Sequence, residues 1–367
     1  MDKGTVYFID DERPVLNALR RALRAPMKGW DVRFEQSPIQ ALEEMQQDLP
    51  WVIIVDRKMP EMDGSDFLRM VQQKYPDAIR VLLTGDTSYK TAAEVAPFCH
   101  FLLAKPFEID DIIDVVDRAV CLRKFELSDE ARQAIGSIQT LPVLPSIYLQ
   151  LVDYLNSAKE PETKTVAELI SQDMSIHSKI IQTANSSFFG TAADVFSAHN
   201  AVVRLGFNLV TKLVFCFQIH ASAQDEEVHK KLVQQAELVA RKCVHLTNLA
   251  QSNSKSIERS YFTGLVHNIG ELVGNHYELN ISTDLIGAFL LKLWGFDQAL
   301  VVALLNQNNP EQCSGDDPVA VHLCIAKQLV AASQNSQDEA CVWESLSDEI
   351  IEKANLRDYV GERNEKV

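Results

Sequence analysis

Four short apolar runs in the first third of the chain each end at residues that carry a charge or a hydroxyl group. The runs do not alternate with polar residues, which is typical of parallel strands buried on both faces. They are residues 6–9 before Asp10 and Asp11, 52–55 before Asp56, 80–83 before Thr84, and 101–104 before Lys105. Because ligands of open α/β sheets gather outside the carboxyl ends of the strands, we expect these polar side chains to meet at one edge.

Helical patterns separate the runs. Val15, Leu19 and Leu23 share one predicted helix face, and apolar residues recur at helical spacing between 109 and 120. Residues 32–34 alternate apolar and polar positions and are predicted to form an edge strand. Strands and helices in alternation predict a parallel sheet with helices on both faces.

The polar groups at the strand ends predict a site for magnesium and a phosphoryl group. Mg²⁺ prefers carboxylate and water oxygens, and a carboxylate can itself accept a phosphoryl group. Asp56 is the candidate acceptor because it ends the central strand and precedes the loop 59–64, Met-Pro-Glu-Met-Asp-Gly. The Lys105 ammonium suits phosphoryl oxygens, and Thr84 offers a hydroxyl to the same oxygens.

Each of these motifs has a simpler explanation when taken alone. An Asp-Asp pair is usually a solvated loop or a helix cap, and a Lys-Pro pair is usually a turn. Order, spacing and position at the strand ends agree for all of them, which favours the functional interpretation.

Residues 1–124 resemble the receiver domain of two-component response regulators. The resemblance implies a flavodoxin-like doubly wound fold with strand order 2-1-3-4-5. It also implies that Asp56 is the phosphoacceptor, and that Mg²⁺ is held by Asp10, Asp11, Asp56 and the backbone carbonyl of Lys58.

The resemblance further implies that Thr84 is the switch hydroxyl and that Lys105 contacts the phosphoryl group. One position departs from the receiver pattern. Leu102 stands where receivers usually have an aromatic switch residue, and Phe101 lies one residue earlier. Successive residues of a strand point to opposite faces, so we do not expect the usual aromatic switch here.

Size and composition limit the remaining possibilities. A chain of 367 residues predicts two or three domains. It has neither a long apolar run nor a basic-then-apolar leader, so we expect a cytoplasmic protein without a membrane span or a secretory signal. The seven cysteines are scattered without a Cys-x-x-Cys pair, and we expect them to be buried thiols rather than metal ligands.

The charge is distributed unevenly. Residues 1–124 contain 17 Lys and Arg against 21 Asp and Glu, a balance of −4, and the remainder contains 18 against 30, a balance of −12. Neutralisation of phosphates by basic side chains is the main source of DNA affinity. The acidic second part is therefore not expected to bind DNA, although a local basic patch stays open as an alternative.

The second part of the chain is predicted to be all-helical. The segment 125–139 is predicted to be a helical linker, residues 140–332 an all-α domain, and 333–367 a loop followed by a short amphipathic helix. Several segments resemble the HDOD domain, a divergent relative of the HD-type phosphohydrolases. They are residues 141–145, 170–173, 184–190, 201–206, 264–272 and 294–296, together with Pro310.

HD hydrolases need an adjacent His-Asp pair and further His and Asp ligands, and this chain departs from that pattern. The pair is His267-Asn268, and a histidine pair of active relatives would fall near Gln307-Asn308. Amides are poor ligands for a transition metal. We therefore expect a degenerate site without a transition metal, although His245 and His267 could still lie close together.

The predicted function is a response regulator whose Asp56 is phosphorylated by a partner histidine kinase, with a non-catalytic HDOD domain that recruits or releases an unknown signalling protein. A homodimer through the face of the fourth and fifth receiver helices is a further expectation. The alternative function is an HD-type phosphodiesterase that acts on a nucleotide such as cyclic di-GMP. His267 favours this alternative, whereas Asn268, Gln307 and Asn308 count against it.

Overall fold

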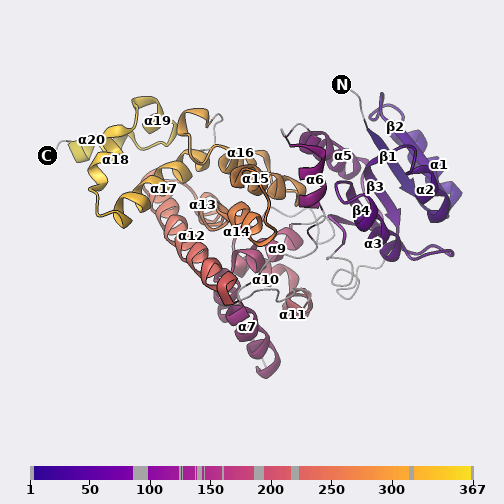
Figure 1. Ribbon diagram of the computed structural model, residues 1–367, viewed down its shortest axis with the longest axis horizontal. Coiled ribbons are helices and arrows are strands. Elements are labelled where there is room, and N and C mark those ends of the chain that lie inside the picture. The colour runs from indigo at the N-terminus through magenta and orange to yellow at the C-terminus, as the bar shows by residue number, and fades with distance from the viewer. Residues whose placement is uncertain are drawn as a thin grey trace.

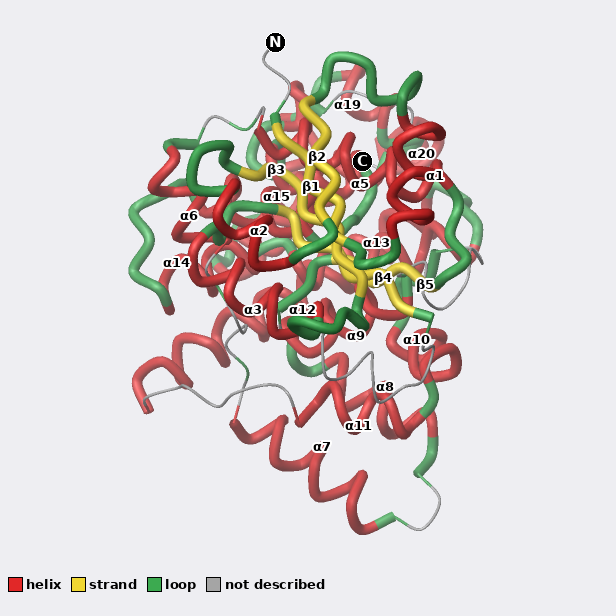
Figure 2. The backbone as a smooth tube through the Cα atoms, turned by 90° about the vertical axis from the view of Figure 1, so that its right-hand side faces the viewer, coloured by secondary structure: helices red, strands yellow, loops and turns green. Residues whose placement is uncertain are grey.

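The structure is a computed structural model that describes residues 4–85, 98–123, 125, 127–136, 138, 143, 145–158, 161–185, 194–215, 223–313 and 318–364. Figure 1 shows two lobes, an N-terminal α/β lobe and a larger helical lobe that ends at the C-terminus. Figure 2 looks onto the α/β lobe, with its strands in front and the helical lobe behind.

Within the described residues, five parallel strands form one sheet in the order β2-β1-β3-β4-β5. The strands are β1 (Thr5–Ile9), β2 (Asp31–Glu35), β3 (Pro50–Asp56), β4 (Ile79–Thr84) and β5 (Phe101–Ala104). The predicted strand order is confirmed, with β2 at an edge and β3 in the centre. The helices of this lobe are α1 (Arg13–Leu23), α2 (Pro38–Glu44), α3 (Gly64–Lys74) and α5 (Ile109–Arg123).

Burial explains why the strand sequences are so apolar. Every residue of β1 and β4 is buried, as is all of β3 except Trp51. Polar side chains instead begin the helices. Ser37 caps α2 by accepting from the backbone N–H of Gln40, and Asp63 caps α3 by accepting from Ser65.

A short helix, α6 (Asp129–Gly136), connects the lobes and lies against the α/β lobe. The buried guanidinium of Arg132 donates to the backbone carbonyls of Leu122 and Phe125 at 2.8 Å, so it satisfies carbonyls at the end of α5. A side chain at Gly136 would have its Cβ 2.4 Å from the Pro76 carbonyl oxygen, so this close approach needs glycine.

The helical lobe is arranged around the long helix α12, against which α13 and α17 pack (Figure 1). The predicted all-helical character is confirmed. Its helices are α7 (Pro145–Ser157), α8 (Thr163–Ser171), α9 (Met174–Ala184), α10 (Ala198–Leu205), α11 (Phe207–Phe215), α12 (Ala223–Leu249), α13 (Ser254–Val266), α14 (Ile269–His276), α15 (Thr283–Leu293), α16 (Gln298–Leu305), the 3-10 turn η2 (Pro310–Gln312) and α17 (Val319–Gln334).

The C-terminal tail is more folded than its sequence pattern predicts. It forms α18 (Glu339–Ser345), α19 (Asp348–Lys353) and α20 (Arg357–Asn364) rather than one short helix. Leu346, Ile350 and Ile351 are all buried, so the tail packs back on the helical lobe. No helix among the described residues has the length and apolar character needed to cross a membrane.

The described cysteines are free thiols, of which Cys99, Cys243, Cys313 and Cys324 are buried and Cys341 is exposed. Cys216 lies outside the described residues.

Candidate functional site

The carboxyl ends of β1, β3 and β5 bring three of the predicted residues into direct contact. The Nζ atom of Lys105 lies 2.9 Å from Oδ2 of Asp10 and 2.5 Å from Oδ1 of Asp56. Asp10 is 2 % exposed and Asp56 is 8 % exposed. The sequence therefore correctly predicts a convergence of charged groups at this edge of the sheet.

Backbone groups fix both carboxylates in place. Oδ2 of Asp56 accepts from the backbone N–H of Lys58 at 2.8 Å, and Oδ1 of Asp10 accepts from the N–H of Glu12 at 2.9 Å. The loop after Asp56 folds back tightly, because the N–H of Gly64 donates to the Arg57 carbonyl at 2.8 Å. A Cβ at Gly64 would lie 2.1 Å from the Asp56 carbonyl oxygen, which explains why glycine begins α3.

Two carboxylates share a single ammonium at this site. Partial burial disfavours the charged amine, but hydrogen bonds and attraction from Asp56 and Asp10 outweigh that effect and raise the pKa of Lys105. Lys105 is therefore cationic at neutral pH. The group of three carries a net charge of about −1, which favours a further cation.

The other residues predicted for the receiver site differ in their surroundings. Thr84 is buried at the end of β4, and its carbonyl accepts from the N–H of Lys105 at 2.8 Å. Asp11 is half-buried, and its backbone carbonyl accepts from the Gln36 side chain. Leu102 is buried and pairs with Leu82 in the sheet.

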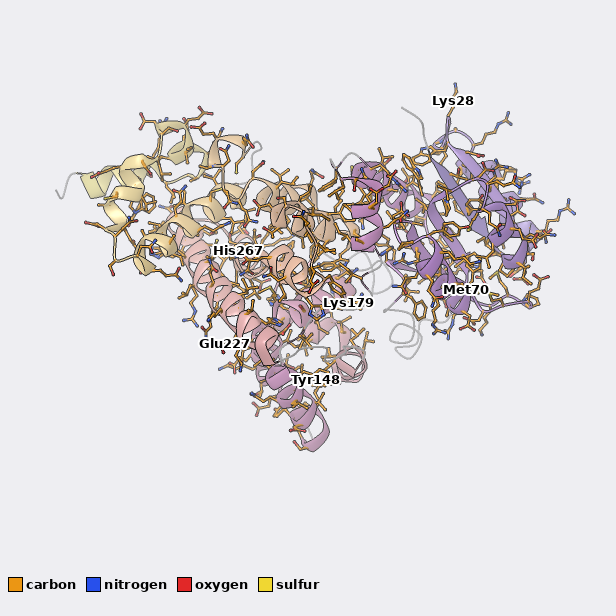
Figure 3. All side chains as sticks on the ribbon, in the orientation of Figure 1. Lys28, Met70, Tyr148, Lys179, Glu227 and His267 are labelled. Atoms are coloured by element: carbon orange, nitrogen blue, oxygen red, sulfur yellow. The ribbon has the colours of Figure 1, made fainter. Side chains whose placement is uncertain are left out.

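The second predicted site lies in the helical lobe, at the junction of α13 and α14. His267 and Asn268 are both buried, and Figure 3 places His267 well inside this lobe. A ring nitrogen of His267, Nδ1, lies 2.7 Å from the Gly264 carbonyl oxygen. Burial and the nearby Lys327 ammonium lower the pKa of His267 to about 3, so the imidazole is neutral.

The side-chain amide of Asn268 donates a hydrogen bond but does not accept one from the described residues. Its Nδ2 donates to the Leu232 carbonyl at 2.8 Å, which ties α14 to α12. Its Oδ1 is buried and has no hydrogen-bond partner within the part of the chain that the structure describes. An asparagine suits this place because an aspartate would have no proton to donate to that carbonyl.

Gln307 and Asn308 join an acid on α15 to an amine on α17. Their amide nitrogens donate to the carboxylate of Asp284 at 2.6 and 2.7 Å. Their amide oxygens accept from Nζ of Lys327 at 2.9 and 2.7 Å. Each amide is thus used at both ends, and Asp284 and Lys327 balance each other's charge through them.

Similarity to known proteins agrees with this division of the chain. A sequence model described as "Response regulator receiver domain" matches residues 6–117, and one described as "HDOD domain" matches residues 141–280. The chain therefore contains a response regulator receiver domain followed by an HDOD domain.

Curated relatives match the receiver end. The DNA-binding transcriptional regulator NtrC of Escherichia coli K12 is 29 % identical over 121 residues, which covers 33 % of this chain and 25 % of NtrC. Response regulator MprA of Mycobacterium leprae is 29 % identical over 141 residues, or 38 % of this chain and 60 % of MprA. The chain thus spans less than two thirds of the length of these relatives.

Solved structures show partial similarity as well. An uncharacterised protein from Neptuniibacter caesariensis is 32 % identical, with a TM-score of 0.31, and the match covers 34 % of this chain and 97 % of that one. The MmoQ response regulator of Methylococcus capsulatus is 17 % identical, with a TM-score of 0.44, over 60 % of this chain and 94 % of MmoQ.

The receiver domain offers Mg²⁺ a suitable donor set. Mg²⁺ usually takes only one or two protein carboxylates and completes its octahedron with water and phosphate oxygens. Asp10 and Asp56 present two buried carboxylates with one unbalanced charge. Across the described residues, no three His, Cys, Asp or Glu side chains are grouped closely enough to hold a metal by themselves.

The HDOD domain contains two residues that the sequence analysis missed, Asp284 and Lys327. A signal for Lys327 was available, since it is the one charged side chain between residues 319 and 330, in an otherwise apolar stretch with His322 and Gln328. The sequence analysis also left open a pairing of His245 with His267. His245 is exposed and lines a surface cleft with Lys242 and Glu339, whereas His267 is buried.

Proposed function

We propose that Asp56 accepts a phosphoryl group from a partner histidine kinase, and that the HDOD domain relays the change through protein contacts. The observation that supports the first step is the convergence of Asp10, Asp56 and Lys105 at the carboxyl edge of the sheet. The units in this proposal are a receiver at 1–124, a linker at 125–139, the HDOD domain at 140–332 and a tail at 333–367.

In the transfer step, a carboxylate oxygen of Asp56 forms the new P–O bond, and the bond between phosphorus and the kinase imidazole nitrogen breaks. Asp10, Asp11, Asp56 and the Lys58 carbonyl are the residues that would hold Mg²⁺, which would supply positive charge next to the phosphoryl oxygens. The N–H of Lys58 fixes the orientation of the Asp56 carboxylate.

Lys105 and Thr84 would then register the product. Lys105 already contacts Asp56, so its ammonium needs only a small movement to reach a phosphoryl oxygen. Thr84 ends the neighbouring strand and offers its hydroxyl to the same group. Leu102 occupies the usual aromatic switch position, so the readout in this chain has to use another side chain.

The proposed role of the HDOD domain is binding rather than catalysis. Gln307 and Asn308 are committed at both ends to Asp284 and Lys327, and Asn268 is committed to the Leu232 carbonyl. A hydrolytic metal would have to displace this network. The partners in the proposal are the kinase, a downstream signalling protein and a second copy of the chain. DNA is not among them because the second part of the chain is acidic.

The decisive experiment compares the wild type with Asp56→Asn after treatment with acetyl phosphate and Mg²⁺. We expect the substitution to lower phosphoryl uptake by more than about a hundredfold, because the amide is a far weaker nucleophile than the carboxylate. Intact-protein mass spectrometry measures the uptake, and circular dichroism checks the fold.

Asp63→Asn is the matched control, because Asp63 caps α3 beside the site and asparagine is an equally good cap. Acid-labile phosphate on folded Asp56→Asn protein at the wild-type level would place the acceptor elsewhere. Elemental analysis of the full chain tests the HDOD role separately, since a stoichiometric transition metal would favour a phosphodiesterase.

A further inference from the structure

The contact between the receiver and the HDOD domain centres on Phe101 rather than on Leu102. In β5, Phe101 and Leu103 point to the side of α5 and line a cleft between the two domains, whereas Leu102 alternates to the other side. The guanidinium carbon of Arg118, on α5, lies 4.9 Å from the centre of the Phe101 ring. An aromatic residue displaced by one position therefore faces the helical domain.

Gly295 completes this contact from the HDOD side. It follows α15 with a φ of +86°, and a Cβ built on it would lie 2.2 Å from an Arg118 nitrogen and 2.8 Å from the edge of the Phe101 ring. Only glycine allows both the backbone conformation and the close approach. The motif Trp294-Gly295-Phe296 thus follows the end of α15 and also forms the contact surface for the receiver domain.

Aromatic side chains extend the contact on both sides. Phe125, just after α5, meets Phe289 of α15 edge-on, with ring centres 5.6 Å apart. Phe296, next to Gly295, packs on Phe262 of α13 at 5.1 Å. Helix α13 leads directly to His267, so the receiver contact continues into the core of the HDOD domain.

The rest of this boundary is polar and incompletely filled. The cleft has a volume of about 520 Å³ and is lined by Asp114 and Arg118 on one side and by Gln182, Asp194 and Lys292 on the other. Gln182 is 8 % exposed, yet its Oε1 has no hydrogen-bond partner among the described residues. Polar interfaces of this kind between domains of one chain are typically able to open.

We propose that Phe101, held between Arg118 and Gly295, is the positioning residue that reports the phosphorylation state of Asp56 to the HDOD domain. Lys105 contacts Asp56 at one end of β5, and Phe101 begins the same strand, about 13 Å away. A shift of Lys105 toward a phosphoryl group moves β5 relative to β4 and loosens the Phe101 contact. This inference rests on the proposed function of Asp56.

The same contact determines which partner can bind this face of the receiver domain. α5 carries Arg118 and packs against α15 in the arrangement that Figure 1 shows. A second copy of the chain that paired through this part of α5 would have to displace the HDOD domain. The closed contact and a homodimer through this face are therefore mutually exclusive.

Hydrogen–deuterium exchange of the full chain tests the proposal, with and without acetyl phosphate and Mg²⁺. In the unphosphorylated protein, Arg118→Ala is expected to make the amides of α15 exchange about five- to tenfold faster, because a partly desolvated cation–π contact is lost. Arg69→Ala is the matched control, since Arg69 also lies 4.9 Å from a ring centre, that of Phe98, and neither residue lines the cleft.

Phosphorylation of the wild type should produce a similar increase in α15, and little further increase in Arg118→Ala. Phe101→Leu should keep phosphoryl uptake but lose most of the phosphorylation-dependent increase, and Phe101→Tyr should restore it. Rescue of this kind separates a reporting role from a merely structural one.

Two outcomes would overturn the proposal. One is wild-type protein that carries the phosphoryl group on Asp56 and shows unchanged exchange in α15. The other is equal exchange in Arg118→Ala and Arg69→Ala. Absence of the phosphoryl group from the treated wild type would instead overturn the proposed function, and mass spectrometry of the same samples distinguishes these cases.

Discussion

The two polar sites of the molecule differ in how their charges are balanced. In the receiver, Asp10 and Asp56 share the single ammonium of Lys105, so one negative charge has no partner within this group. In the HDOD domain, Asp284 and Lys327 stand one to one, joined through the amides of Gln307 and Asn308. The receiver group favours another cation, whereas the HDOD group is already neutral.

The comparison shows how a polar cluster between helices can be balanced by side chains alone. Amide side chains donate and accept at once, so they can link one acid and one amine across two helices. A carboxylate can only accept when ionised, and it stays reactive as long as its charge is not fully neutralised. Substitutions that add or remove a charge at either site therefore test the comparison directly.

The largest effect on stability is expected from Asn268→Asp. The new carboxylate would be buried, would lose the bond to the Leu232 carbonyl and would face that oxygen instead. A buried charge without a partner costs about 4 kcal/mol in the free energy of unfolding. Chemical denaturation measures the loss. Asn253→Asp is the control, because Asn253 is a helix cap where aspartate serves equally well.

Addition of Mn²⁺ or Zn²⁺ to Asn268→Asp tests whether the new carboxylate can bind a metal or only adds an unpaired buried charge. If Asn268→Asp is destabilised without metal but regains wild-type stability with stoichiometric metal, one substitution has rebuilt a metal site. That result would contradict the proposal that the charges near this site are already balanced by Lys327 and the amides of Gln307 and Asn308.

Removal of the ammonium itself should have the next largest effect. Lys327→Met leaves the side-chain oxygens of Gln307 and Asn308 without their donor and Asp284 without its balancing charge. We expect a loss of about 2 kcal/mol, measured by denaturant unfolding at neutral pH. Lys164→Met, at an exposed and weakly paired lysine, should change stability by less than about 0.5 kcal/mol. A more stable Lys327→Met protein would mean that the lysine is retained for another purpose.

The receiver was more predictable than the HDOD site for a physical reason. Its functional groups each end a strand, so the order of apolar runs alone places Asp10, Asp56 and Lys105 at one edge. The resemblance to receivers also drew attention to Leu102 at the usual aromatic position. No pattern in the sequence, however, shows that Phe101 contacts Gly295.

In the HDOD domain, the decisive contacts join residues far apart on different helices. Asp284 precedes Gln307 by 23 residues, and Lys327 follows it by 20. Helical periodicity indicates which face is buried but not which polar residues on separate helices will meet. The sequence therefore singled out Asn268, Gln307 and Asn308 but not the network that joins Gln307 and Asn308 to Asp284 and Lys327.

A smaller effect is expected at the receiver site itself. Lys105→Ala removes the shared ammonium and leaves Asp10 and Asp56 facing each other, so Mg²⁺ affinity should be retained or increased. The exchange response of the receiver to phosphorylation should fall about tenfold, because the charge that senses the phosphoryl group is gone. Calorimetric titration measures Mg²⁺ binding. Equal phosphorylation responses in Lys105→Ala and wild type would show that Lys105 is dispensable.

The HDOD core is also expected to make stability depend on pH. Burial lowers the pKa of His267 to about 3 and that of His177 to about 4, so both rings are neutral when folded and protonate more readily when unfolded. The stability that they contribute is present above the unfolded pKa near 6.5 and is lost as pH falls below it. Each contributes a slope of up to about 1.4 kcal/mol per pH unit between pH 6.5 and its folded pKa.

His267→Asn tests this slope at one of the two positions. Its amide can keep the hydrogen bond to the Gly264 carbonyl, so the fold should survive while one titrating group disappears. Urea unfolding at pH 5 and pH 7 should then show a smaller difference between the two conditions than in the wild type. His199→Gln, at an exposed position, controls for the loss of a histidine as such. An unchanged difference in His267→Asn would mean that His267 is not a neutral, buried counterpart to the charged receiver site.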